Sequence, residues 1–153
     1  MTLVSLTVFL VAAMSHLAPG RDHRDVAVRM ASVIAEERPL FHDDADRIRT
    51  ASLVCAVAWR ESSFRVDAIG DEGRAFGLYQ LWHAPRQVLS DVELATRLAM
   101  QRLRESMRIG GSENPLGLYA AGPRHWDSPK ARRISADRLH IAKRLAKAAE
   151  VSP

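Results

Sequence analysis

Glu61 stands at the end of a predicted helix, in a position where a carboxyl group could act as an acid. Val54, Ala58 and Glu61 are spaced at i, i+4 and i+7, so they share one helix face. That face is apolar, and burial among apolar groups raises the pKa of a carboxyl because it disfavours the charged form. A carboxyl that stays protonated near neutral pH can donate to a leaving oxygen, as glycosidic bond cleavage requires. The alternative is a Glu that is bonded by its neighbours and has no catalytic role.

Two further carboxylates follow in the loop after this helix. Asp71 and Glu72 lie between two glycines, as at a solvated loop tip. A glycoside hydrolase normally uses a second carboxylate as base or nucleophile, so both residues are candidates for activating water. Asp67 is interpreted as a turn residue. The sequence alone leaves open whether Glu61 works with a partner.

Other reaction classes find little support in the residue pattern. None of the six histidines stands at metal-ligand spacing from a carboxylate partner. Ser62 and Ser63 lack the His and Asp neighbours that would activate a nucleophilic serine. The single cysteine, Cys55, excludes an internal disulfide and lies in an apolar run that is typical of a buried core thiol. We therefore expect neither a metal nor a cofactor.

The segment that begins at Glu61 carries a specific combination of short motifs. It contains Glu61-Ser62-Ser63-Phe64, Asp67-Ala68, Gly73 and Gly77-Leu78-Tyr79-Gln80. In this order, they resemble the signature of the soluble-lytic-transglycosylase-like, goose-type-lysozyme-like family. A later segment, Tyr119-Ala120-Ala121-Gly122, resembles the family's Tyr-Asn-Ala-Gly. The likeness is close over residues 61–82 and loose over about residues 48–122.

The resemblance implies a role for each matching residue. Glu61 corresponds to the catalytic acid/base, and Gln80 to a glutamine that lines the glycan groove. Trp82 falls where the family often has Met, at a platform under a sugar ring, and Tyr119 would place its hydroxyl near the acid. The other predicted substrate-binding positions are Ser63, Gly77 and Leu78. A glycine at position 77 lets the main chain approach a ligand closely because it has no Cβ.

The reaction implied by the resemblance is the cleavage of the bond between N-acetylmuramic acid and N-acetylglucosamine in peptidoglycan. A lytic transglycosylase uses one Glu and the substrate's own 6-hydroxyl, and it releases a 1,6-anhydro product. One alternative is a hydrolytic muramidase that uses Asp71 or Glu72. Another is a low-activity wall-binding component of a virion or secretion machine. Ala120 keeps that last alternative open, because it removes a polar contact that the family's Asn would supply.

The rest of the chain predicts mostly helices. Apolar residues recur at helical spacing over 22–38, about 44–61, from Ser90 to 110 and about 135–151. Ser90 with Glu93 fits a capping box at the start of the third helix. The Gly-rich stretch 62–85 lacks periodicity and predicts a loop with short strands. The expected fold class is mainly α (α+β, lysozyme-like), a single helical domain over 21–153 with a central Gly-rich loop or small β element beside the groove.

Length and charge limit the partners. A chain of 153 residues suits one domain. Its net charge of +4 favours an acidic partner, and between Arg124 and Lys147 eight Lys or Arg face only two Asp. Peptidoglycan strands are the expected partner, with envelope or virion machinery as a further candidate. We expect no nucleic acid, because no motif for it accompanies the charge, and we expect a monomer.

The first twenty residues have three interpretations. No Asp, Glu, Lys or Arg occurs from Thr2 to Gly20, and the stretch Leu3–Met14 is strongly apolar. Residues 1–20 are therefore read as a signal segment, as an N-terminal helix packed on the domain, or as an anchor. A signal segment would place the protein in the cell envelope or periplasm, or outside the cell. Association with a virion is the other location that we consider.

Overall fold

The computed structural model describes residues 2–41 and 46–151 and is mainly helical, with one small sheet. Its helices are α1 (Leu3–Leu17), α2 (Arg24–Glu36), α3 (Asp46–Ser62), α4 (Val92–Gly110), α5 (Gly117–Ala121) and α6 (Pro129–Val151). The strands β1 (Ile69–Gly70), β2 (Ala75–Phe76) and β3 (Leu81–Trp82) form an antiparallel sheet in that order. Short 3-10 turns cover Asp71–Gly73 and Arg86–Leu89. The predicted mainly α class with a small β element is confirmed.

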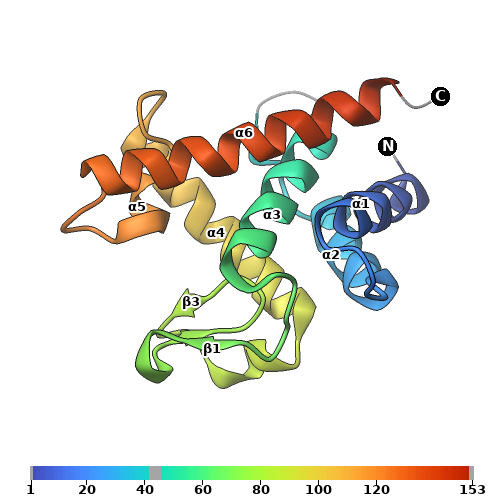
Figure 1. Cartoon of the computed structure of the whole chain (residues 1–153), viewed down its shortest axis with the longest axis horizontal. Helices are drawn as coiled ribbons and strands as arrows, with labels where there is room; N and C mark the ends of the chain where they lie inside the picture. Colours follow the sequence, from blue (N-terminus) through green and yellow to red (C-terminus); the bar gives the residue numbers. More distant parts are fainter. Residues whose placement is uncertain (1, 42–45, 152–153) are drawn as a thin grey trace.

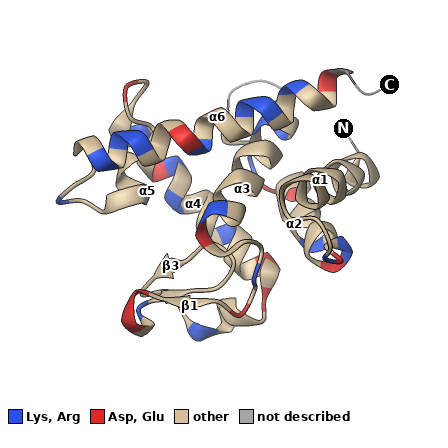
Figure 2. Cartoon of the chain, viewed as in Figure 1, with Lys and Arg blue, Asp and Glu red and all other residues tan. Residues whose placement is uncertain are grey.

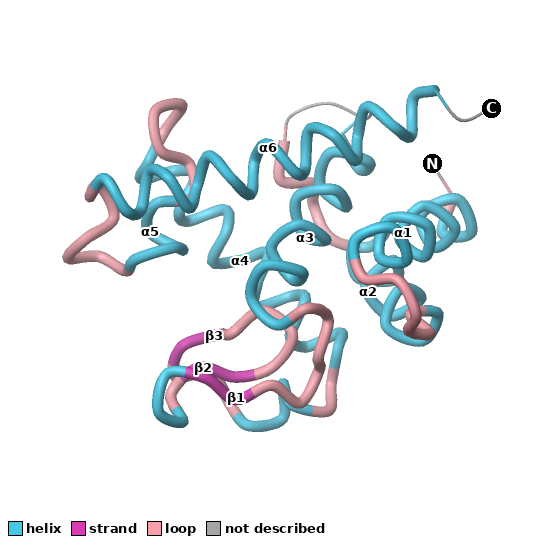
Figure 3. Tube along the Cα trace, in the orientation of Figure 1, coloured by secondary structure: helices cyan, strands magenta, loops and turns pink. Residues whose placement is uncertain are grey.

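The helices surround α3, as Figure 1 shows. The long helix α6 crosses α3, while α1 and α2 lie side by side on another flank. The sheet and its loops lie at the end of α3 where Glu61 is located, and Figure 3 shows the three strands gathered there. The chain segment that carries the motif therefore folds directly over the end of the central helix.

Helix α3 is the centre of the core. Every residue from Thr50 to Ala58 is buried, so this part of the helix is enclosed on all sides rather than on one stripe. Cys55 is among these residues, which confirms the prediction of a buried thiol. The expected start of this helix near Asp44 lies outside the described residues. Its end at Ser62 agrees with the predicted end at Glu61.

Helix α1 packs onto the domain. Leu6, Leu10 and Met14 are fully buried at helical spacing, and they contribute to the same core as α2 and α3. Val4 and Val8 on the opposite face remain exposed. Across residues 2–41 and 46–151, the structure has no helix with the length and apolar character needed to cross a membrane. N-terminal sequencing of the mature protein tests whether residues 1–20 are removed as a signal segment, which is one of the three interpretations.

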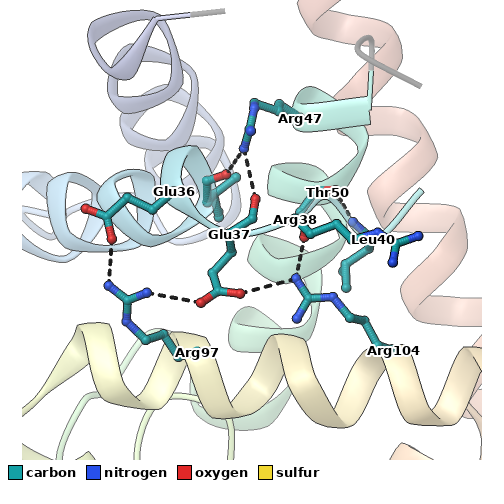
Figure 4. Close-up of polar contacts among 9 residues, drawn as sticks. Glu36, Glu37, Arg38, Leu40, Arg47, Thr50, Arg97 and Arg104 are labelled. Carbon is teal, nitrogen blue, oxygen red and sulfur yellow. Dashed lines mark hydrogen bonds and ion pairs between the residues drawn. The ribbon is translucent and has the colours of Figure 1, made fainter. Parts of the chain in front are cut away.

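Ion pairs join the end of α2 to α4, and a hydrogen bond joins it to α3 (Figure 4). Arg97 of α4 pairs with Glu36 at 2.7 Å and with Glu37 at 3.1 Å. Arg104, two turns further along α4, approaches the second oxygen of Glu37 at 3.5 Å. Arg47 of α3 donates to the main-chain oxygen of Glu37 at 3.2 Å, satisfying a carbonyl that has no partner within α2. These contacts set the relative positions of three helices.

Two helix starts differ from the sequence prediction. The expected capping box of Ser90 and Glu93 is wrong, because Asp91 is the cap and its side chain accepts the N–H of Leu94 at 2.8 Å. Ser90 instead donates to a carbonyl in the preceding 3-10 turn. Helix α6 begins at Pro129 rather than near Ser135. Proline is favoured at a first helical position because its missing N–H needs no partner there.

We expect Asp91→Ala to lower the free energy of unfolding by about 1 kcal/mol, since it removes the cap of α4. The melting temperature should fall by about 2–4 °C. Ser90→Ala is the matched control, and it should change stability by less than about 0.5 kcal/mol. Thermal denaturation followed by circular dichroism measures both variants. A larger loss for Ser90→Ala than for Asp91→Ala would contradict the observed cap.

Candidate active site

A groove of about 1030 Å³ opens beside the end of α3. Its walls come from the last turn of α3, the sheet, α4, α5 and α6, so segments far apart in the sequence meet there. The polar and aromatic residues that line it include Glu61, Asp71, Gln80, Trp82, Tyr119 and Arg138. Four of these, Glu61, Gln80, Trp82 and Tyr119, were predicted from the sequence as catalytic or substrate-binding residues, and Asp71 was a candidate second carboxylate.

Glu61 lies on the last turn of α3 with only 18% of its side chain exposed. Its Oε1 accepts a hydrogen bond from Nη2 of Arg138 at 2.5 Å. Burial raises the pKa of the Glu61 carboxyl above its ordinary value, while the charge and hydrogen bond of Arg138 oppose the rise. The sheltered position was predicted, but the purely apolar surroundings were not found. A cation shares the site with the acid.

Sequence reasoning missed Arg138, although its position in α6 held a signal. The buried residues of α6 follow one another at intervals of four and three, namely Ala131, Ser135, Arg138, Ala142 and Leu145. Arg138 thus occupies an inward position of an otherwise small or apolar stripe, and it is 7% exposed. An arginine at such a position needs an anionic partner, because burying an unpaired charge is costly. The general excess of Lys and Arg in this region hid the one that faces inward.

Trp82 and Gln80 reach the groove from the sheet and the turn before it. Trp82 is 45% exposed, with the guanidinium of Arg74 5.0 Å from its ring centre. Arg102 of α4 donates to the main-chain oxygen of Trp82 at 2.7 Å and so fixes the strand against that helix. The Gln80 amide donates to the carbonyls of Ala68 and Gly77, at 3.2 and 3.1 Å. Gln80 therefore braces the loop as well as lining the groove.

Tyr119 lies on α5 with its ring 5.9 Å from the Arg138 guanidinium carbon. Its hydroxyl donates to the main-chain oxygen of Tyr79 at 2.8 Å. Burial raises the pKa of Tyr119 well above its ordinary value, and the negative charge of Glu61 adds to the rise. The ring lines the groove near the acid, and the hydroxyl is already engaged with the loop that follows α3.

The structure does not bring the other three predicted substrate-binding residues to the groove wall. Ser63 is exposed, and its carbonyl accepts from Arg21 at 3.1 Å. Leu78 is fully buried, and its carbonyl accepts from the Ser62 hydroxyl at 2.8 Å. Gly77 is a buried residue within the loop itself. These residues shape the loop under the groove because the chain turns at the end of α3 and passes back below it.

The loop after Glu61 holds an unusual number of strained residues. Within residues 2–41 and 46–151, every non-glycine residue with a positive φ lies between positions 63 and 83. They are Ser63, Phe64, Asp71, Glu72, Gln80 and His83, with φ between 46° and 64°. Such conformations disfavour residues with a Cβ and are concentrated at functional sites in proteins. Their clustering beside the groove supports its assignment as the functional site.

The remaining candidate groups are placed less favourably for chemistry. Asp71 lines the groove, whereas Glu72 projects from the loop tip with 88% of its side chain exposed and pairs with Arg74 at 3.3 Å. Burial raises the pKa of the Cys55 thiol to about 12, which removes it as a nucleophile. Among the described residues, no three His, Cys, Asp or Glu side chains are grouped as metal ligands.

Gly77→Ala tests whether the loop is held by close backbone packing. Gly77 has a φ of +73°, and an added Cβ would lie 2.8 Å from the carbonyl oxygen of Val88. Gly73→Ala is the matched control, because Gly73 has a φ of +82° with nothing within 4 Å of that position. We expect the control to lose about 1–2 kcal/mol through its backbone conformation and Gly77→Ala about 1–3 kcal/mol more. Equal losses in denaturant unfolding would contradict the close packing.

Comparisons with known proteins found no relative of this chain. No protein-family model matches the chain, and neither the curated proteins nor the solved structures contain a match.

Proposed function

We propose that this protein is a peptidoglycan lytic transglycosylase, with Glu61 as its catalytic acid/base. The observation that carries the proposal is the position of a largely buried carboxyl at the edge of a groove. Gln80, Trp82 and Tyr119 line the same groove, Gln80 and Trp82 from the segment at β3 and Tyr119 from α5. The resemblance of residues 61–82 to the lytic transglycosylase signature supports the same assignment.

In the proposed reaction, Glu61 first donates its proton to the oxygen that links N-acetylmuramic acid to the next sugar. The bond between C1 and this oxygen breaks as positive charge develops at C1. The 6-hydroxyl of the same muramic acid then attacks C1 and gives its proton to the Glu61 carboxylate. The products are a 1,6-anhydro end and a free 4-hydroxyl, without added water. One carboxyl that changes between its two forms is sufficient for both steps.

Charge and shape support a glycan of the cell wall as the substrate. The Trp82 side chain lines the groove and is 45% exposed, and an indole suits stacking on a sugar ring. Most charged positions of α6 carry Lys or Arg, as Figure 2 shows, so the surface beyond the groove favours an anionic polymer. The proposed setting is the cell envelope, outside the cell, or a virion. Assembly with envelope or virion machinery remains part of this proposal, with the protein itself a monomer.

One observation favours a second candidate, a hydrolytic muramidase. Asp71 lines the groove together with Glu61, so a second carboxylate is available to position water. Its side chain is 43% exposed and lies 3.6 Å from the Arg74 guanidinium. A hydrolase would release reducing ends in place of 1,6-anhydro ends, and the two products differ in mass by one water molecule.

We expect Glu61→Gln to lower the rate of peptidoglycan cleavage by about 10²–10⁴-fold, because it removes the proton donor. Mass spectrometry of digested peptidoglycan measures the rate and identifies the ends. The wild type should yield 1,6-anhydro ends. Glu113→Gln, in an exposed loop away from the groove, should retain full activity.

Each other outcome has a definite meaning. If the wild type releases reducing ends, the protein is a hydrolytic muramidase and the assignment as a lytic transglycosylase is wrong. An unchanged rate of cleavage for Glu61→Gln would exclude Glu61 as the catalytic acid in either reaction. A wild type that binds peptidoglycan without cleaving it would favour the wall-binding component.

Trp82→Ala tests the sugar platform. We expect KM for soluble glycan fragments to rise by about 2- to 10-fold with little change in kcat, because the stacking surface is lost. Trp82→Phe retains an aromatic face and should lie closer to the wild type. Equal and large losses of kcat in both variants would argue against a platform role.

A further inference from the structure

We propose that Arg138 is a positioning residue that fixes the Glu61 carboxyl at the groove and favours its charged, proton-accepting form. This inference deepens the proposed function and rests on it for its catalytic consequence. Its structural part concerns only the coupling between two side chains, which can be measured without any substrate.

The geometry places Arg138 in direct contact with the acid. Nη2 of Arg138 lies 2.5 Å from Oε1 of Glu61, a short charge-assisted hydrogen bond. Arg138 is 7% exposed, so solvent screens the pair far less than it would a surface ion pair. No other hydrogen bond to this carboxyl is formed within the described residues. Arg138 therefore orients Glu61 through one oxygen and leaves the other for the substrate.

Arg138 is the only cation that contacts Glu61 directly among the described residues. The other charged or titratable side chains that line the groove from the packed elements are Asp71, Arg102, Glu105, Tyr119, Arg124 and His125. Arg102 is engaged with the carbonyl of Trp82, and Tyr119 donates to the carbonyl of Tyr79. On α3 itself, Arg60 turns away to Asp137. Burial therefore raises the pKa of Glu61, and Arg138 is the charged group that opposes this rise.

A contribution to the stability of the fold does not by itself explain why Arg138 is buried at this position. Its Nε and Nη1 are buried without a hydrogen-bond partner, which costs free energy. A buried ion pair can often be replaced by apolar residues of similar volume without loss of stability. The neighbouring pair of Arg60 with Asp137, at 2.7 Å, already joins α3 to α6 at the surface. A role in positioning the Glu61 carboxyl and stabilising its charged form explains why the buried Arg138 is present at the groove in addition to Arg60.

The sign of the effect follows from the charge. Arg138 stabilises the carboxylate, so removing it should raise the pKa of Glu61 further above the ordinary value. A general acid loses activity as pH rises through its pKa, because it loses the proton that it must donate. The alkaline limb of the pH–rate profile should therefore move to higher pH in a variant without the cation. In the wild type, Arg138 offsets part of the rise in the Glu61 pKa that burial causes. The carboxyl can then both donate a proton and accept one back, as the proposed reaction requires.

The test is a titration of the full chain labelled with 13C at the Glu side-chain carboxyls, followed by NMR, with Glu61 assigned by its absence in Glu61→Gln. We expect the titration midpoint of Glu61 to rise by about 1–3 pH units in Arg138→Met. Arg138→Lys retains the positive charge and should stay near the wild type. Arg60→Met is the matched control, since it breaks the adjacent ion pair between the same helices and should leave the Glu61 midpoint unchanged.

An unchanged midpoint in Arg138→Met would overturn the proposal, as would an equal rise in Arg60→Met. If Arg138→Met does not fold, Arg138→Gln keeps a hydrogen-bond donor without the charge, and a smaller rise of the Glu61 midpoint is expected. The pH profile of kcat on peptidoglycan provides the second measurement, and its alkaline limb should follow the NMR midpoint.

A shifted midpoint in a protein that cleaves no glycan would support the coupling between Arg138 and Glu61 but contradict the proposed enzymatic function. A cleaving enzyme whose midpoint does not shift would retain the function and reject the role of Arg138.

Discussion

The burial of one carboxyl beneath a crossing helix constrains the whole arrangement. Glu61 closes the central helix at a place where the core gives way to the groove, and a charge there requires a partner. Helix α6 supplies that partner through Arg138, so the helix must cross α3 at this point. The loop after Glu61 turns back below the groove. Among the described residues, every non-glycine residue with a positive φ lies in this loop.

Much of the framework could be predicted from the sequence because its signals are local. The apolar spacing in α2, α3 and α4 gave their type and approximate extent, and the glycines gave the position of the loop. The wrong prediction of the helix cap also came from a local signal, but that signal was ambiguous. Ser90 and Asp91 are adjacent and both are good caps, so the choice depended on the path of the preceding turn.

The site itself could be predicted only in part, because two different kinds of information define it. Glu61, Gln80 and Trp82 follow from a contiguous motif, and the structure brings them to one groove. Arg138 comes from a distant helix, and its relevance depends on how α6 docks. Ser63 and Leu78 belong to the motif, yet the Ser63 side chain is exposed away from the groove wall and the Leu78 side chain is buried in the core. A motif identifies a segment, whereas the fold decides which atoms of that segment face outward.

The two adjacent ion pairs between α3 and α6 also determine how these helices can associate. On α3 a positive residue precedes a negative one, and on α6 the order is reversed, so Arg60 meets Asp137 and Glu61 meets Arg138. Docking that exchanged these partners would bring guanidinium against guanidinium and carboxylate against carboxylate. Apolar packing alone tolerates small slips between helices, but this alternation of charge penalises them. The sequence of charges therefore favours one mutual orientation of α6 and α3.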